Sequence, residues 1–333
     1  MNGIQKKYLP FALLGLGALY TCSGPVARIL DFKASHEPSN SVIVITGCDH
    51  GMGQSMALTL ANRGYIVVSL CLTAKGAACL QSLQQEGSSI EIIVGDVTKE
   101  SCIAMIETSL QRVVVGQKKL WAVINNAGIA PCGFTDWMSL DITKRCMDVN
   151  FFGPVALVKA CMPFLQRSRG SRIINISSLA GLSSGANLGT YSASKHALEG
   201  WSKALRAELA PFGVRVCNVN PGFMQTPLLK TSSEQGLALF KAHGNQTLYS
   251  DEMILGMARS VDAIQEDPSK VVRLVTDYLV THARPPLRNF SGLQAHLGMR
   301  WLLMFPQALQ DWAGPIMTPL KGINHEEIRR MQI

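Results

Sequence analysis

Short runs of apolar, β-branched residues recur along this chain and alternate with longer segments of amphipathic, helical spacing. The runs cover residues 41–46, 65–70, 91–95, 120–124, 172–177 and 214–219. Runs that are this short and this continuously apolar are typical of strands buried in a parallel sheet. Their alternation with helical segments predicts an α/β fold in which helices flank a parallel sheet.

The turn after the first predicted strand is rich in glycine. It reads Thr46-Gly47-Cys48-Asp49-His50-Gly51-Met52-Gly53 and leads into an amphipathic helix and a second strand. Glycines let the backbone approach a pyrophosphate, and a helix N-terminus offers free N–H groups and a positive dipole end. In this setting the turn indicates dinucleotide binding rather than a plain tight turn, although its T-G-x-x-x-G-x-G spacing differs from the usual G-x-G-x-x-G.

Tyr191 and Lys195 lie four residues apart and share one face if their segment is helical. A phenol titrates near pH 10 and is a poor base at neutral pH, but a close ammonium favours the phenolate and lowers that pKa. The pair could therefore exchange a proton with an alcohol near neutral pH. The spacing also occurs by chance in surface helices, so its meaning depends on the rest of the chain.

Polar and glycine residues follow the predicted strands where each strand ends. They are Asp96, Asn125, Ser178 and Pro221-Gly222, in addition to the glycine turn. Ligands of open α/β sheets bind beyond the carboxyl ends of the strands. A merely structural protein has no need of such a cluster.

Together these pieces resemble the short-chain dehydrogenase/reductase family in order and in spacing. The matching elements are Thr46-Gly47-x-x-x-Gly51-x-Gly53, Asp96, Asn125-Asn126-Ala127-Gly128, Asn150, Ser178, Tyr191-x-x-x-Lys195 and Pro221-Gly222. The phrases at 46–49, 120–128 and 149–153 are similar to the branch of membrane-bound retinol dehydrogenases, hydroxysteroid dehydrogenases and hydroxybutyrate dehydrogenase. The resemblance implies a single domain with a Rossmann-type, doubly wound sheet, and it is weaker after residue 223.

The resemblance also implies roles for individual residues. Tyr191 would be the general acid/base, Lys195 would lower its pKa and bind the nicotinamide ribose, Ser178 would hold the substrate oxygen, and Asn150 would hold a water of a proton relay. The cofactor-binding residues would be Gly47, Asp49, Gly51, Met52, Gly53, Asp96, Asn125, Tyr191, Lys195 and Pro221. Within this set the glycines would line the pyrophosphate, Asp96 would contact the adenine, and Asn125 would support the sheet.

The choice between NAD and NADP is not decided by the residues after the second strand. An acid there holds the ribose hydroxyls of NAD, and an arginine accommodates the phosphate of NADP. The segment from Ser69 to Thr73 contains neither. The related branch often prefers NAD, so the resemblance favours NAD over NADP.

Composition narrows the class of protein. The 333 residues are 47% hydrophobic and 16% charged, below the roughly 25% charged of an average soluble domain, which indicates membrane contact or deep burial. The net charge of +8 fits anionic cofactor phosphates or an anionic membrane, while the absence of basic runs with interleaved aromatics argues against nucleic-acid binding. Nine scattered cysteines without a C-x-x-C pair predict neither a disulfide framework nor a metal site.

Both ends of the chain contain apolar segments. Lys6 and Lys7 precede an apolar stretch that reaches Ala27, which only just attains the ~20 residues needed to span a bilayer. No A-x-A site follows, so we predict an uncleaved signal-anchor, with a cleaved signal peptide and a soluble arm as alternatives. The region around Trp301 and Trp312 is predicted to be a helix that packs on the domain or on a second subunit of a homodimer, or an interfacial membrane element.

The chain is predicted to contain one catalytic domain with a segment on either side. A hydrophobic segment at 1–30 and a linker at 31–40 precede a dinucleotide-binding catalytic domain at 41–290, whose residues 223–265 form a substrate lid. A C-terminal extension covers 291–333. Asn245-Gln-Thr247 and Asn289-Phe-Ser291 are glycosylation sequons, and modification of either would place the domain in a lumen.

The predicted function is hydride transfer between a nicotinamide cofactor and a hydrophobic alcohol or ketone of the steroid or retinoid class. The apolar residues of the lid favour a lipophilic substrate. One alternative is a hydroxybutyrate-type dehydrogenase for a small polar hydroxy acid, which would need a basic side chain in the pocket. A second is a catalytically silent dinucleotide-binding sensor or scaffold. The predicted location is a membrane, that of the endoplasmic reticulum before that of the mitochondrion.

Overall fold

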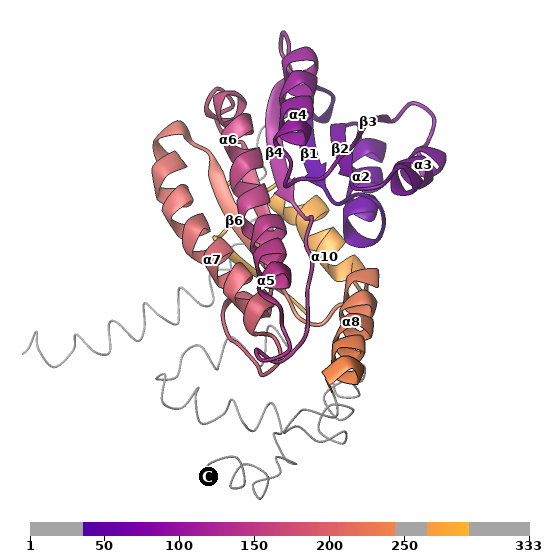
Figure 1. Ribbon diagram of the computed structural model, residues 1–333. Coiled ribbons are helices and arrows are strands. Elements are labelled where there is room, and N and C mark those ends of the chain that lie inside the picture. The colour runs from indigo at the N-terminus through magenta and orange to yellow at the C-terminus, as the bar shows by residue number, and fades with distance from the viewer. Residues whose placement is uncertain (1–35, 244–264, 293–333) are drawn as a thin grey trace, which may run out of the picture.

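The computed structural model describes residues 36–243 and 265–292, and these residues form one sheet of seven strands (Figure 1). All neighbouring strands are parallel, in the order β3-β2-β1-β4-β5-β6-β7. The strands are β1 (Ser41–Thr46), β2 (Ile66–Cys71), β3 (Ser89–Val94), β4 (Lys119–Asn125), β5 (Arg172–Ile176), β6 (Arg215–Pro221) and β7 (Arg288–Ser291). The first six confirm the predicted strands; β7 has only four residues and gave no sequence signal.

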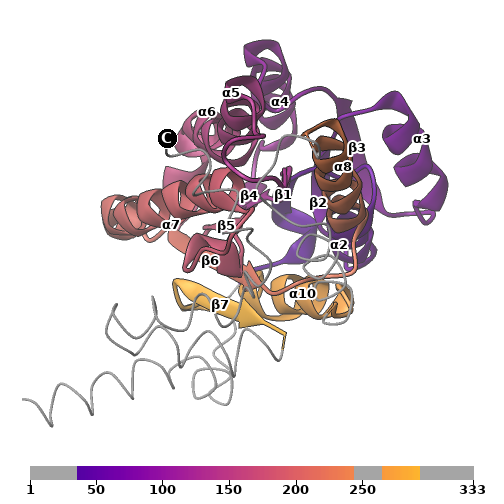
Figure 2. The same ribbon diagram turned by 60° about the horizontal axis from the view of Figure 1, so that its bottom comes forward.

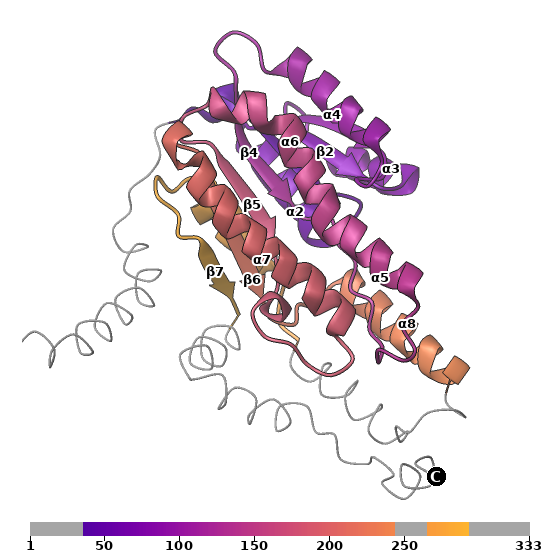
Figure 3. The same cartoon turned by 60° about the vertical axis from the view of Figure 1, so that its left-hand side comes forward.

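Helices cover both faces of the sheet, as the doubly wound fold requires. One face is covered by α2 (Gly51–Asn62), α3 (Ala74–Leu83), α10 (Ser269–Arg273) and the π-helical segment η6 (Leu274–Leu279). The other face is covered by α4 (Glu100–Val113), α6 (Gly153–Gln166) and α7 (Gly189–Leu209), which run in front of the strands in Figure 3. The predicted α/β architecture is confirmed.

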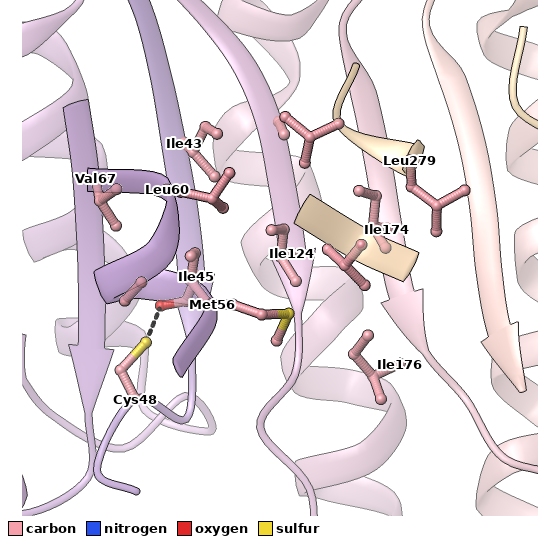
Figure 4. Packing of buried hydrophobic residues seen from close by; sticks show 14 of the residues in the cluster. Ile43, Ile45, Cys48, Met56, Leu60, Val67, Ile124, Ile174, Ile176 and Leu279 are labelled. Carbon is pink, nitrogen blue, oxygen red and sulfur yellow. Dashed lines mark hydrogen bonds between the residues drawn. The ribbon is translucent and has the colours of Figure 1, made fainter. Parts of the chain in front are cut away.

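The two hydrophobic cores follow from the alternation of side chains along each strand. Ile43 and Ile45 of β1 point into the core beneath α2, where they meet Met56 and Leu60 (Figure 4). Val42 and Val44 point into the opposite core. Because both faces are buried, β1 is apolar at every one of its central positions.

The strand order places a topological switch point, here called the crevice, between β1 and β4. The chain moves outward from β1 to β2 and β3, then crosses back to β4 and moves outward the other way. The loops that follow β1 and β4 therefore separate above the sheet at its carboxyl edge, which is where ligands of such folds bind. Figure 2 shows this edge with α8 (Pro227–His243) beside it.

The opposite edge of the sheet holds a buried arginine. Arg172 is fully buried, and its guanidinium donates hydrogen bonds to the carbonyl oxygens of Leu279, Val280 and His282. It also stacks over Trp121, with 4.1 Å between the guanidinium carbon and the ring centroid. His36 stacks on Trp121 at 4.2 Å, so the predicted linker meets the domain at the edge opposite the crevice.

One continuous helical run among the described residues, 140–166, is long and apolar enough to cross a membrane. It contains α5 (Leu140–Met147) and α6, and α6 buries Leu157 and Leu165 against the sheet. We therefore assign it to the core of the domain. The predicted membrane segment at 1–30 lies outside the described residues, as does the C-terminal extension beyond residue 292.

The second sequon is not available in the folded domain. Asn289 lies in β7 and is only 3% exposed. Its side-chain amide donates to the carbonyl oxygens of Asn218 and Pro286, at 3.2 and 3.0 Å. Asn289 is therefore not accessible to modification once the domain has folded, and Asn245 lies outside the described residues.

Candidate active site

Tyr191 and Lys195 lie on the first turns of α7, at the carboxyl edge of the sheet. The Lys195 Nζ atom donates a 2.8 Å hydrogen bond to the carbonyl oxygen of Ile176, the last residue of β5. It lies 5.8 Å from the centroid of the Tyr191 ring. The predicted helical spacing is thus realised, and the ammonium lies close to the phenol.

The electrostatic setting of the two side chains differs from that in water. Burial raises the pKa of Tyr191 to about 12, although a hydrogen bond with the Ser178 hydroxyl acts to lower it. Burial lowers the pKa of Lys195 to about 8, while Cys146 and Glu199 act to raise it. Burial therefore favours the neutral form of both side chains, and neighbouring charges can shift both pKa values.

Ser178 lies just after β5 and faces Tyr191. Its hydroxyl oxygen accepts from the amide of Ala180 at 3.1 Å, which caps the short turn that follows. Its backbone carbonyl accepts from the side-chain amide of Asn220 at 3.1 Å. Ser178 is therefore held by its own turn and by β6, with its hydroxyl beside the phenol.

Asn150 lies in a π-helical segment, η2 (Asp148–Phe152), between α5 and α6. Its side chain accepts from the backbone N–H of Ile129 at 2.9 Å and donates to the carbonyl of the same residue at 2.8 Å. The amide also donates to the Ser194 hydroxyl at 2.9 Å. Asn150 thus fixes the loop after β4 against α7, and its predicted role in holding a water stays a prediction.

Gly128 lies close to the side chains of both Asn150 and Lys195. A methyl group at Gly128 would lie 3.2 Å from the Asn150 Oδ1 atom and 3.7 Å from the Lys195 Nζ atom. The Asn-Asn-Ala-Gly segment therefore brings the end of β4 directly to Lys195. The structure brings Asn150, Ser178, Tyr191 and Lys195 together, from the π-helical segment η2, the end of β5 and the helix α7.

The glycine turn adopts the backbone that a phosphate-binding turn needs. Gly47 and Gly51 have φ of +72° and +63°, which favour glycine. A methyl group at Gly53 would lie 2.1 Å from the carbonyl oxygen of Gly47, so α2 can approach β1 this closely only with glycine there. His50 provides no side-chain cap and the first turn of α2 has no acid, which leaves its N–H groups available to an anion.

Thr46 and Asn126 hold the two strand ends of the crevice together. The Asn126 amide donates to the carbonyl oxygens of Thr46 and Gly47, at 2.9 and 3.1 Å. The Thr46 hydroxyl accepts from the backbone N–H groups of Asn126 and Ala127. Neither residue was singled out from the sequence, although both lie inside matched motifs.

Asp49 brings a carboxylate to the end of β2. One oxygen accepts from the backbone N–H of Leu72 at 2.7 Å, and the other accepts from the N–H and the hydroxyl of Thr73, at 2.9 and 2.7 Å. A methyl group at Gly76 would lie 2.4 Å from this carboxylate, so the first turn of α3 can accept it only because Gly76 has no side chain. The residues that directly follow β2 include no acid, but in the structure the Asp49 carboxylate of the glycine turn lies at this position.

Asp96 follows β3 on the same edge. Its carboxylate accepts from the backbone and hydroxyl of Thr98, and it forms a 2.8 Å ion pair with Arg145. Partial burial acts to raise the pKa of Asp96, but the bonds from Thr98 and Arg145 outweigh it and hold this pKa below its usual value. The predicted contact with adenine would therefore have to share a carboxylate that already has three protein donors.

The remaining cofactor candidates lie around the crevice. Asn125 is buried at the end of β4 and donates to the Asn175 side chain at 2.7 Å, which supports its expected role in the sheet. Met52 packs against the core beneath α2, and Pro221 is the buried last residue of β6. Among the described residues, no group of three His, Cys, Asp or Glu side chains could hold a metal ion.

A cavity of about 620 Å³ lies beside the first turn of α7. It is open to solvent and is lined by the loop after β4 and by the loop that leads into α7, through Gly133, Phe134, Thr135, Asp136, Gly185, Ala186, Asn187 and Gly189. The helix α8 packs on the first of these loops, where Ser232 bonds to the carbonyl of Ala130 and to Cys132. Its volume is within the range of pockets for drug-sized ligands.

Comparison with known proteins places this geometry in context. Residues 41–236 match the model of the short chain dehydrogenase family. The chain is 38% identical over 219 residues to mouse retinol dehydrogenase 5, an alignment that covers 66% of each protein. It is 32% identical over 281 residues to human 17-beta-hydroxysteroid dehydrogenase type 6, which covers 81% of this chain and 86% of that protein.

The fold also matches solved structures. A short chain dehydrogenase/reductase from Burkholderia phymatum, in complex with NAD, superimposes with a TM-score of 0.68 at 24% identity. The match covers 83% of this chain and 97% of the other. At this identity the likeness concerns the fold alone.

Proposed function

The chain belongs to the short-chain dehydrogenase/reductase family, and we propose that it interconverts a lipophilic secondary or primary alcohol of the retinoid or steroid class and its carbonyl form, with NAD as the hydride carrier. Family membership makes it an oxidoreductase that uses a nicotinamide cofactor. The observation that carries the proposal is the approach of Ser178, Tyr191 and Lys195 at the carboxyl edge of the sheet.

The proposed chemistry divides between the cofactor and the chain. The nicotinamide, when bound, supplies the hydride acceptor or donor. The Ser178 hydroxyl holds the substrate oxygen next to the Tyr191 phenol, which takes the hydroxyl proton during oxidation and returns it during reduction. The Lys195 ammonium favours the phenolate by Coulomb attraction and so acts against burial, which raises the Tyr191 pKa.

Two observations support a lipophilic substrate. The relatives named above are a retinol dehydrogenase and a hydroxysteroid dehydrogenase. The cavity at the first turn of α7 is large enough for such a molecule, and the described residues that line it include the acid Asp136 but no lysine or arginine. A small hydroxy acid would need a cation to hold its carboxylate, so the lining disfavours that alternative.

Asp49 supports NAD rather than NADP. In folds of this kind the adenosine ribose binds at the end of β2, and an acid there holds its hydroxyls. The Asp49 carboxylate lies at that point and already accepts from Leu72 and Thr73. A 2′-phosphate would bring a second negative charge to this carboxylate, whereas a free 2′-hydroxyl could donate to it.

We place the protein at a membrane through the apolar segment at 1–30, in the endoplasmic reticulum before the mitochondrion. The position of His36 supports an attachment at the edge opposite the crevice, which would leave the site free. A homodimer is the proposed assembly, and the C-terminal extension is proposed to pack on the domain, on the second copy or on the membrane.

The test is a substrate screen of the full-length protein in detergent, followed by nicotinamide absorbance. Retinoid alcohols, hydroxysteroids and hydroxybutyrate are each offered with NAD and with NADP, in both directions. Turnover of a retinoid or steroid with NAD, and its loss in Tyr191→Phe, is the expected result. Turnover of hydroxybutyrate alone would contradict the substrate class, and cofactor binding without turnover of any alcohol would indicate the silent scaffold.

A further inference from the structure

Glu199 is a buried carboxylate that no motif and no step of the proposed proton transfer uses. It lies one helical turn beyond Lys195 on α7, and it is only 3% exposed. Tyr191, Lys195 and Glu199 are spaced four residues apart and so share one face of the helix. A buried carboxylate is costly unless it is paired and hydrogen-bonded, so its partners indicate what it does.

The first partner leads to the substrate side of the site. The Asn220 side-chain amide donates to the Glu199 Oε1 atom at 2.7 Å. The same amide donates to the backbone carbonyl of Ser178 at 3.1 Å. A single buried amide on β6 therefore joins the carboxylate of Glu199 to the residue whose hydroxyl faces Tyr191.

The second partner comes from the last strand. The Nε atom of Arg288 lies 3.3 Å from the Glu199 Oε2 atom, and the two form an ion pair. Arg288 begins β7 and lies opposite Asn218 in the sheet. The charge of Glu199 is thus balanced by a cation of the last strand.

The loop after Ser178 rests directly on this network. A methyl group at Gly181 would lie 3.0 Å from the Lys195 carbonyl oxygen and 3.1 Å from the Glu199 Cγ atom. No room is left between the loop and this face of α7. A change in the position of Glu199 would therefore be passed on to the turn that carries Ser178.

We propose that Glu199 is a positioning residue of the oxidoreductase site: through Asn220 it fixes the Ser178 turn beside Tyr191, and through its charge it supports the ammonium of Lys195. Arg288 holds the carboxylate in place from β7. The inference rests on the proposed function of Tyr191, Lys195 and Ser178.

The negative charge of Glu199 should affect the pH dependence of the reaction, which a purely structural role would not do. The titratable and charged groups around the pair are Tyr191, Lys195 and Glu199 on α7, Cys146 on α5, Cys132 in the loop after β4, and Arg288 on β7. The phenol and the amine titrate as a coupled pair. Removal of a nearby negative charge makes both of their protons easier to lose, so both limbs of the pH profile move to lower pH.

The test compares Glu199→Gln with Glu208→Gln, an exposed acid on the same helix. A glutamine can still accept from Asn220, but it has no charge and presents donors to Arg288. We expect Glu199→Gln to lower kcat/KM for the alcohol by about 10-fold or more. We also expect both pH limbs to move to lower pH, with cofactor affinity within about 2-fold of wild type. Glu208→Gln should match wild type in all three measurements.

The double variant Glu199→Gln/Arg288→Met distinguishes an effect of Glu199 on the site from a loss of folding stability. It removes the half-buried cation of Arg288, which the single variant leaves without its carboxylate partner, so its thermal midpoint should recover while the pH profile stays shifted. If the single variant does not fold, the double variant alone tests the role of Glu199. A wild-type pH profile in either variant, or recovery of kcat/KM together with the midpoint, would overturn the inference. A wild-type protein that turns over no alcohol would instead overturn the proposed function.

Discussion

The ammonium of Lys195 donates a 2.8 Å hydrogen bond to the carbonyl oxygen of Ile176, the last residue of β5. The bond joins the face of α7 that carries the candidate catalytic residues to the carboxyl edge of the sheet. It also leaves the ammonium 5.8 Å from the centroid of the Tyr191 ring. The distance between the two proposed proton-transfer groups is therefore set by the packing of a helix on a strand.

Replacement of Tyr191 by phenylalanine removes the proposed proton carrier and little else. We expect Tyr191→Phe to bind the cofactor with wild-type affinity and to lose about 10³-fold or more in kcat, because general acid/base groups contribute 10²–10⁴-fold. Cofactor fluorescence titration and steady-state rates check the two parts. A variant with wild-type turnover would contradict the proposed mechanism.

Lys195 should make stability depend on pH in a defined window. Its pKa is about 8 in the folded protein and 10.5 when exposed, so between these values the unfolded chain binds more protons and stability rises with pH. Relative to Lys195→Met, the wild type should gain up to about 3 kcal/mol across this window. Urea unfolding at about pH 7 and about pH 10 measures the difference. A constant difference would mean that burial does not shift this lysine.

Asp49 should discriminate between the two cofactors. We expect Asp49→Asn to lower kcat/KM with NAD and to raise it with NADP, which shifts the preference by about 10-fold or more. Asp96→Asn is the matched control, because Asp96 follows β3 and should affect both cofactors alike. An unchanged ratio in Asp49→Asn would show that this carboxylate only holds the end of β2.

Two helical glycines should respond in opposite ways to alanine. The new methyl group of Gly53→Ala would lie 2.1 Å from the Gly47 carbonyl oxygen, so we expect loss of cofactor binding and of stability. Gly200 lies on the exposed side of α7 with nothing within 4 Å, and Gly200→Ala should stabilise the protein by up to about 1 kcal/mol. Thermal denaturation compares them, and equal effects would contradict the proposed close approach at Gly53.

Removal of residues 1–28 should release the protein from membranes. The apolar segment in this region is predicted to be the anchor, and the described domain meets its linker at His36, away from the crevice. Membrane flotation of the full chain and of the truncated chain measures the effect, and activity in detergent shows whether the domain stays intact. A full-length chain that is soluble without detergent would refute the anchor.

The sequence by itself determined the fold class and predicted most of the residues of the candidate site. The β-branched runs predicted six of the strands because burial on both faces requires apolar residues at every position, as in Val42 to Ile45. The spacing of Tyr191 and Lys195 predicted their common face because a helix has a fixed period. These features depend on local geometry, which short sequence patterns record.

Tertiary structure alone decided how distant residues meet. The carboxylate of Asp49 reaches the end of β2, and Glu199 meets both Asn220 and Arg288, across separations that no local pattern encodes. Asn289 matched a sequon but is buried in β7, a strand whose four residues are held by one neighbour. Each of these outcomes follows from the packing of parallel strands side by side, which places residues far apart in the sequence within a hydrogen bond of one another.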